Sequence, residues 1–138
     1  MVDSNARIPG QMVDSLSAYE FQVQLDGEIV NGVFSVQGLT SFAGEGELPP
    51  LLITKMVKRD PNTPFNRWIR ETQQAAGGAL PTRNVVIVAM DEGTETRRWS
   101  YQNARIVRVG YSEFNTALSE LVEERITIRA ESVAEEWL

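Results

Sequence analysis

Carboxylates are the main side chains of this sequence that could do acid–base chemistry, because histidine and cysteine are both absent. The chain therefore lacks an imidazole base, a thiolate nucleophile and the usual zinc and haem ligands. Two carboxylates that meet in space, about 5 to 10 Å apart, would still suffice for a glycosidase. The acidic clusters are Asp91-Glu92-Glu95, Glu123-Glu124 and Glu131-Glu135-Glu136. None has the spacing of a known acid–base motif, so we interpret them as solvated surface and keep a carboxylate enzyme as a minor alternative.

Other kinds of site have weak support in the sequence. The segment 91–95 only faintly resembles a calcium-binding loop, and Gly44-x-Gly46 does not lie between a strand and a helix, where a phosphate loop would. Phe21, Trp68 and Trp99 could line a ligand pocket inside a barrel, but large aromatic residues in a small domain usually fill the core. We expect no metal and no cofactor, and a small-ligand-binding barrel remains an alternative.

Length and charge restrict the class of protein further. With 138 residues, 42% hydrophobic and 23% charged, the chain fits one folded domain. A net charge of −6 disfavours specific binding of nucleic acid. The longest apolar run, 85–90, is far shorter than the roughly 20 residues of a membrane-spanning helix. The first residues lack the pattern of a signal peptide, so we expect a soluble protein made in the cytoplasm, with no membrane insertion.

Hydrophobic periodicity predicts a sheet-rich fold with one helix. Residues 19–25 alternate between apolar and polar, and Asp26-Gly27 then marks a turn. Thr63 and Pro64 suit the start of a helix whose inner face carries an apolar group at helical spacing. That group is Phe65, Trp68 and Ile69. Further strands are expected over residues 29–37, 51–57, 85–90, 97–102, 106–111 and 122–130. The predicted fold class is all-β with one flanking α-helix, a β-barrel-like sandwich of six to eight strands.

The predicted domain organisation is one β-domain between two terminal segments. Residues 1–18 are expected to form a flexible or assembly arm, 19–132 the β-domain, and 133–138 a polar C-terminal tail. The loop over 40–50 holds two glycines, two prolines and two acids, and is too long for a simple hairpin link. Its apolar residues, Phe42 and Leu48, lack a core of their own and need a partner.

Several segments resemble the tail tube protein family of contractile-tailed phages and of extracellular contractile injection systems. Residues 19–27 are similar to the opening strand of that family, and 33–39, Val-Phe-Ser-Val-Gln-Gly-Leu, to its second strand. The helix motif at 65–69, the segment 98–104 and the segment 114–117 follow in the order of the family. The resemblance covers residues 19 to about 132.

This resemblance implies a structural, non-enzymatic role. Family members assemble as hexameric rings that stack into a hollow inner tube, so the expected partners are further copies of the chain, a surrounding sheath protein, baseplate and cap proteins, and effector cargo in the lumen. The expected place of action is an extracellular or cell-attached injection particle. A contractile phage tail tube is the alternative within the same family.

We expect three groups of residues to serve assembly. The first is an apolar outer strand face that would be buried between copies within a ring. The second is the 40–50 loop, which would reach the adjacent ring and dock on its arm. The third consists of strand residues opposite the core, which would line an acidic lumen. The ring-contact residues are Val86, Val88 and Met90. The stacking-loop residues are Phe42, Gly44, Glu45 and Leu48. The lumen candidates are Gln22, Gln24 and Glu124.

Overall fold

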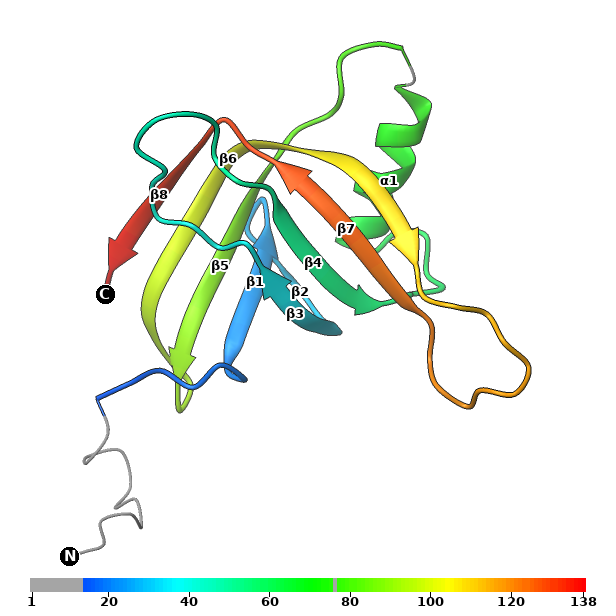
Figure 1. Cartoon of the computed structure of the whole chain (residues 1–138), viewed down its shortest axis with the longest axis horizontal. Coiled ribbons are helices and arrows are strands. Elements are labelled where there is room, and N and C mark those ends of the chain that lie inside the picture. The colour runs from blue at the N-terminus through cyan, green and yellow to red at the C-terminus, as the bar shows by residue number, and fades with distance from the viewer. Residues whose placement is uncertain (1–13, 76) are drawn as a thin grey trace, which may run out of the picture.

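The computed structural model describes residues 14–75 and 77–138, which form eight strands and one helix (Figure 1). The elements in chain order are β1 Phe21–Leu25, β2 Glu28–Val30, β3 Val33–Gln37, β4 Leu51–Met56, α1 Pro64–Gln74, β5 Arg83–Asp91, β6 Thr94–Tyr111, β7 Glu123–Arg129 and β8 Ser132–Trp137. The predicted fold class, all-β with one helix, is confirmed.

The strands form two antiparallel sheets that share the long strand β6. Sheet A contains β2, β1, β5, the first half of β6 and β8, whereas sheet B contains the second half of β6, β7, β4 and β3. In Figure 1 the sheets curve around a common interior, and α1 lies beside sheet B. Since β6 passes from one sheet into the other, both sheets are fixed to a single strand.

The core lies between the two sheets and under α1. Sheet A contributes alternate residues such as Val23 and Leu25, and sheet B contributes Ile53 and Ile126, as the period of two in a strand requires. Trp68 of α1 is also fully buried, and its indole N–H donates to the carbonyl of residue 81 at 3.0 Å. The remaining core residues are Val30, Leu51, Phe65, Ile69, Val85, Ile87, Tyr101, Ala104, Ile106 and Ile128.

The helix begins where the sequence predicts. Thr63 is the N-cap residue, with its hydroxyl accepting from the backbone N–H of Asn66 at 3.4 Å, and Pro64 occupies the first turn. Phe65, Trp68 and Ile69 are the buried face, as expected. The helix ends at Gln74 with Ala75 as C-cap.

Three expectations about strands were wrong. Residues 29–37 are not one strand, because Gly32 has a φ of +83° and the chain there leaves β2 in sheet A and enters β3 in sheet B. Residues 97–102 and 106–111 belong to one strand, β6, which continues through Asn103 although Asn103 has a φ of +52°. The segment expected as a C-terminal tail forms β8, which pairs with β6.

The predicted assembly arm lies mostly outside the described residues, which begin at residue 14. Residues 14–19 are exposed and form no helix or strand. Among the described residues no helix has the length and apolar character needed to cross a membrane.

Candidate assembly surfaces

Both sheets end in strands that have only one neighbour among the described residues. In sheet A these edge strands are β2, which pairs with β1, and β8, which pairs with β6. In sheet B they are β3, which pairs with β4, and the second half of β6, which pairs with β7. An open strand edge presents backbone groups that can pair with a strand from another chain. The fold therefore offers edges for assembly on two sides.

The three residues expected at a ring contact differ in their accessibility. Val86 and Met90 are half-buried, so another copy could cover them further. Val88, by contrast, is 0% exposed within the single chain. It lies between Gln22 of β1 and Arg98 of β6, whose side chains share its sheet face. The prediction for Val88 therefore needs correction, because this side chain can gain no further burial from a neighbour.

Gln22 and Gln24 lie on the face of sheet A opposite the core, as the alternation predicts. The neighbouring β1 residues Val23 and Leu25 are buried, whereas both glutamines are partly exposed. The Gln24 side-chain amide donates to the Gln22 side-chain oxygen at 2.7 Å. These two glutamines thus form a polar, uncharged row on the outer face of the sheet.

Glu124 does not lie on an outer face, contrary to our expectation. It is 3% exposed and points inward with Ile126 and Ile128, as the period of two in β7 requires. Its carboxylate forms an ion pair with Lys55 of β4 at 2.8 Å, and Lys55 is itself 1% exposed. Glu124 is therefore excluded as a lumen residue, and the corrected interpretation is a structural ion pair inside the sandwich.

The surroundings of this ion pair satisfy its charges within the chain. The Lys55 ammonium also donates to the carbonyl of Met56 at 2.8 Å and lies 5.8 Å from the centre of the Phe65 ring. Burial raises the pKa of Tyr111, and the nearby Glu124 carboxylate raises it further. Since buried charges are tolerated only when paired, each charge here depends on its partner, and the site offers no free group for chemistry.

The 40–50 loop is tied down at both of its ends. At the first end the backbone N–H of Thr40 donates to the Tyr101 hydroxyl at 2.8 Å, and the Trp99 indole N–H donates to the Ser41 hydroxyl at 3.0 Å. At the second end Glu47 pairs with Arg129 of β7 at 3.4 Å. Because both ends are anchored on the sandwich, the middle of the loop is presented in a defined place.

The middle of the 40–50 loop is open to solvent. Phe42 is 82% exposed, and Gly44 and Glu45 are exposed as well. Gly44 has a φ of +71° with no atom near its Cβ position, so it shapes the turn without packing on anything. Leu48 is different, because it is half-buried against the core of its own chain. The structure therefore brings Phe42, Gly44 and Glu45 together at the tip and assigns Leu48 to the base.

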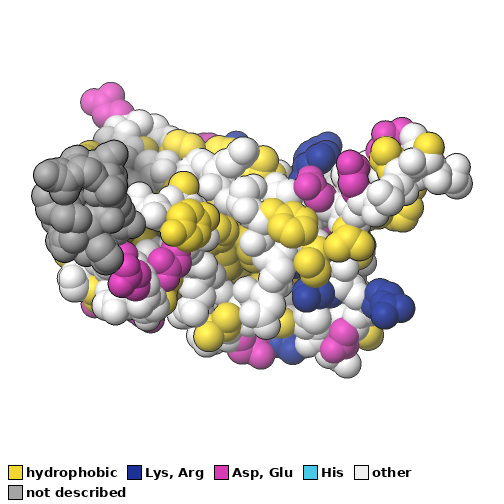
Figure 2. Space-filling model, turned by 90° about the horizontal axis from the view of Figure 1, so that it is seen from below, with side chains coloured by type: hydrophobic (Ala, Val, Ile, Leu, Met, Phe, Trp, Pro, Cys, Tyr) yellow, Lys and Arg dark blue, Asp and Glu magenta, His cyan; other side chains and the backbone are white. Residues whose placement is uncertain are grey.

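A second projecting loop, over residues 112–122, was not among the segments expected to serve assembly. It connects β6 to β7 and carries three exposed apolar residues, which are Phe114 (78%), Leu118 (43%) and Leu121 (71%). Figure 2 shows hydrophobic and acidic side chains together on the part of the molecule that projects at the right. The signal in the sequence was the presence of these large apolar residues between two strands.

Apart from the buried Glu124, several carboxylates of the acidic clusters named above are engaged in ordinary surface contacts. Glu123 pairs with Arg125, Glu135 with Arg97, and the Asn103 amide donates to Glu131. Among the described residues no group of three or more acidic side chains is placed to hold a metal ion.

Comparison with known families and structures identifies the family. The model of the family described as T4-like virus tail tube protein gp19 matches residues 40–134, more than two thirds of the chain. A comparison with curated protein sequences found no match.

Solved structures share the fold at low sequence identity. A chain of the extracellular contractile injection system PVC, in its sheath–tube complex, is 16% identical with a TM-score of 0.74, covering 92% of this chain and 95% of that one. A chain of the anti-feeding prophage cap is 19% identical with a TM-score of 0.74, covering 100% of both. Hcp1 from Flavobacterium johnsoniae is 11% identical with a TM-score of 0.57, covering 87% of this chain and 97% of that one.

Two independent lines thus agree on this chain. The sandwich of two sheets joined through β6, with one helix, is the fold of these solved structures, and the sequence itself matches the family model over most of the β-domain. The chain belongs to the T4-like virus tail tube protein gp19 family, whose members are structural tube proteins rather than enzymes.

Proposed function

We propose that this protein is the inner-tube subunit of a phage-tail-like contractile injection system, in which hexameric rings stack into a hollow tube. The observation that carries the proposal is the family match, together with the fold shared with the PVC sheath–tube complex. A tail tube of a contractile phage is the second candidate, because the family is described by a virus tail protein. Both candidates require the same self-assembly of one β-sandwich.

Ring formation in this proposal uses the open edges of sheet A. The free edge of β8 in one copy pairs with the free edge of β2 in the next, so the sheet continues around the ring. Ile29 of β2 is 54% exposed and lies at this edge. Val86 lies beside Gln24 on the outer face of sheet A, so edge-to-edge pairing leaves Val86 on the lumen side of the continued sheet and not between two copies. Such a head-to-tail contact closes into a ring when its rotation divides a full turn.

The lumen in this proposal is lined by the outer face of sheet A, with Gln22 and Gln24 among its residues. Six copies at −6 each carry a total charge of −36. An assembly of this charge repels anionic cargo from its walls, so that such cargo slides through without binding. Neutral amide side chains at the surface would also give few strong contacts to a passing chain.

The further partners follow from the same proposal. A tube of a contractile system is surrounded by a sheath protein and closed by cap and baseplate proteins, and the related solved structures carry the titles sheath–tube complex, tube terminating cap and baseplate. Effector cargo would occupy the lumen. The protein would assemble in the cytoplasm and act in an extracellular or cell-attached particle.

Native mass spectrometry of the purified chain tests the ring. We expect a species of six copies of the 15.4 kDa chain, about 92 kDa. Ile29→Lys should leave only smaller species, because a charge at an open strand edge opposes edge-to-edge pairing. Val57→Lys, at an exposed apolar residue that belongs to no strand, is the matched control and should keep the hexamer. Monomers alone from the unmodified chain at all concentrations would contradict the proposal.

A further inference from the structure

The two projecting loops leave sheet B at its opposite ends. The 40–50 loop leads into β4 at Leu51, which pairs with Ile128, whereas the 112–122 loop leads into β7 at Glu123, which pairs with Met56 at the far end of β4. The six residues of β4 separate the two loop bases by about 20 Å at 3.3 Å per residue. Figure 1 shows the loops on opposite sides of the molecule. Each loop carries a large apolar side chain that its own chain leaves uncovered, Phe42 at one end and Leu121 at the other.

The 112–122 loop is held in a fixed shape. The backbone N–H of Glu123 donates to the Ser112 hydroxyl at 2.8 Å, and the backbone N–H of Ser112 donates to the carbonyl of Glu123 at 2.9 Å, which closes the base. Within the loop, the Asn115 side chain accepts from the backbone N–H of Ala117 at 2.9 Å, and the Asn115 carbonyl accepts from Leu118 at 3.0 Å. A loop ordered in advance loses less entropy when it binds.

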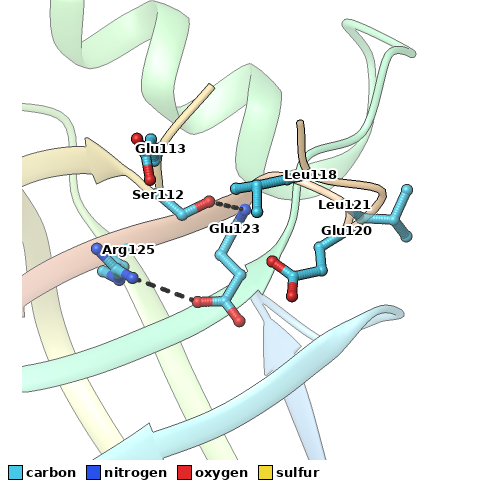
Figure 3. Close-up of a pocket in the computed structure, with 7 residues that line it drawn as sticks. All are labelled: Ser112, Glu113, Leu118, Glu120, Leu121, Glu123 and Arg125. Atoms are coloured by element: carbon cyan, nitrogen blue, oxygen red, sulfur yellow. Dashed lines mark hydrogen bonds and ion pairs between the residues drawn. The ribbon is translucent and has the colours of Figure 1, made fainter. Parts of the chain in front are cut away.

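This loop also encloses a pocket of about 430 Å³ (Figure 3). Leu118 and Leu121 contribute its apolar lining, and Ser112 and Glu123 line the side at the base of the loop. Figure 3 shows Leu118 and Leu121 on the loop itself, with the Glu123 side chain below them. The pocket has room for one aromatic side chain and no residue of its own chain fills it among the described residues.

Symmetry decides how such surfaces meet in a tube. A contact between two like loops is isologous and closes after two rings, whereas a contact between unlike loops is heterologous and continues without limit. Resting on the proposed function, we infer that Phe42 of one copy packs against Leu118 and Leu121 of a copy in the next ring. The 112–122 loop is thus the docking surface of the 40–50 loop, and the partner is a second copy of this chain.

The net negative charges of the two loops oppose this contact. The tip of the 40–50 loop carries Glu45, and Glu47 follows it, while the pocket is lined by three acids and one base, so that its charge is also negative. These are Glu113, Glu120, Glu123 and Arg125. Like charges brought together repel each other, and salt screens this repulsion because the Debye length falls to about 8 Å at 0.15 M. Apolar burial therefore drives the contact against electrostatic repulsion, and stacking strengthens as the salt concentration rises.

Site-directed cross-linking tests the inference. Because the chain contains no cysteine, only the introduced thiols can react. Ala43→Cys and Glu120→Cys proteins, altered at two exposed sites that leave Phe42 and Leu121 in place, are mixed, assembled and treated with a short bismaleimide. We expect covalent dimers that contain one copy of each variant, and only traces from either variant alone. Gln74→Cys on α1 is the matched control for an exposed site outside the contact, and Ser4→Cys reports the alternative that the N-terminal arm is the docking surface.

The outcomes separate this inference from the proposed function. If tubes form and Ala43→Cys cross-links to Ser4→Cys or Gln74→Cys instead of Glu120→Cys, the inference is overturned while the tube stands. If the unmodified chain forms neither rings nor tubes, the proposed function fails and the inference fails with it. Stacking that weakens as salt rises would also overturn the inference, since it would indicate attraction between opposite charges.

A mixing experiment gives a second, independent test. Phe42→Ser leaves the 112–122 surface intact, and Leu121→Ser leaves the 40–50 loop intact, so each variant alone should form single rings without tubes. Rings of the two variants, prepared separately and then combined, should join once and stop, giving particles of two rings in negative-stain micrographs. Normal tubes from Leu121→Ser alone would contradict the inference.

Discussion

The interior of sheet B and the loops at its two ends differ in how far their side chains are partnered within one chain. Inside, the charges of Lys55 and Glu124 are fully partnered within one chain, at 2.8 Å from each other. At the ends, the described residues leave Phe42 82% and Leu121 71% exposed. The interior and the ends of sheet B therefore have different roles. Its interior determines whether the single chain folds, and its ends determine what the folded chain binds.

Removing one partner of the buried ion pair should have the largest effect on folding. Lys55→Met leaves the Glu124 carboxylate buried without a counter-charge, so we expect a loss of about 3 to 5 kcal/mol in the free energy of unfolding. Lys55→Met combined with Glu124→Leu removes both charges and should recover most of that loss. Denaturant titration measures both proteins. A single variant as stable as the original would show that the pair does not decide the stability of the interior.

Substitution of Gly38, which precedes the 40–50 loop, should cause a smaller but clear loss of stability. A Cβ at this position would lie 2.3 Å from the carbonyl oxygen of Pro50, and its φ is +85°. We expect Gly38→Ala to lower the free energy of unfolding by about 1 to 3 kcal/mol. The causes are backbone strain at a positive φ and the clash with the carbonyl of Pro50. Gly44→Ala at the loop tip is the matched control, since its φ is also positive but its Cβ meets no atom. Equal losses for both variants would argue that the base of the loop is not held more tightly than its tip.

A carboxylate bound to the turn between β5 and β6 should make a small, pH-dependent contribution to the stability of the fold. The Glu20 carboxylate accepts from the backbone N–H groups of Glu92 and Gly93 at 2.9 and 2.8 Å, and these bonds lower its pKa below the ordinary 4.5. A lowered pKa in the folded state stabilises the protein above pH 4.5, and this contribution is lost as the pH falls through the folded value.

Glu20→Gln should therefore be slightly less stable than the original chain at pH 7, and the difference should shrink below pH 4.5. Thermal unfolding of both proteins across this range measures it. A difference that grows in acid would mean that the carboxylate does not act through its charged form.

The smallest effect on folding is expected at the loop tip. Phe42→Ser should change the free energy of unfolding by no more than about 0.5 kcal/mol, because exposed residues away from packing contribute little. The same variant should lose tube formation altogether. A large loss of stability would instead show that Phe42 belongs to the fold, and the contrast between interior and ends would disappear.

Local pattern was sufficient to predict most of the secondary structure. The alternation around Val23 and Leu25 predicted β1, and Thr63 with Pro64 predicted the start of α1, because both signals depend only on near neighbours. Strand β8 gave no such signal. Its pairing with β6 joins residues about 30 positions apart, as between Gln102 and Ser132, and single-sequence periodicity carries no information on such contacts.

The candidate assembly residues could be predicted only where exposure follows from local pattern. Phe42 and Gln24 were placed correctly on exposed or outer surfaces, but Glu124 was not. Its charge suggested solvent, whereas its register placed it opposite Lys55 inside the sandwich. Val88 failed for a similar reason, because its cover comes from side chains on two neighbouring strands. In both cases the deciding partner is distant in the sequence.

Electron microscopy of the purified, unmodified chain tests the central claim most directly. The protein assembled at high concentration and moderate salt should form hollow tubes built of stacked sixfold rings, with the face that carries Gln22 and Gln24 toward the lumen and the 40–50 loop against the next ring. A uniform population of monomers, or an assembly in which that face points outward, would contradict the account.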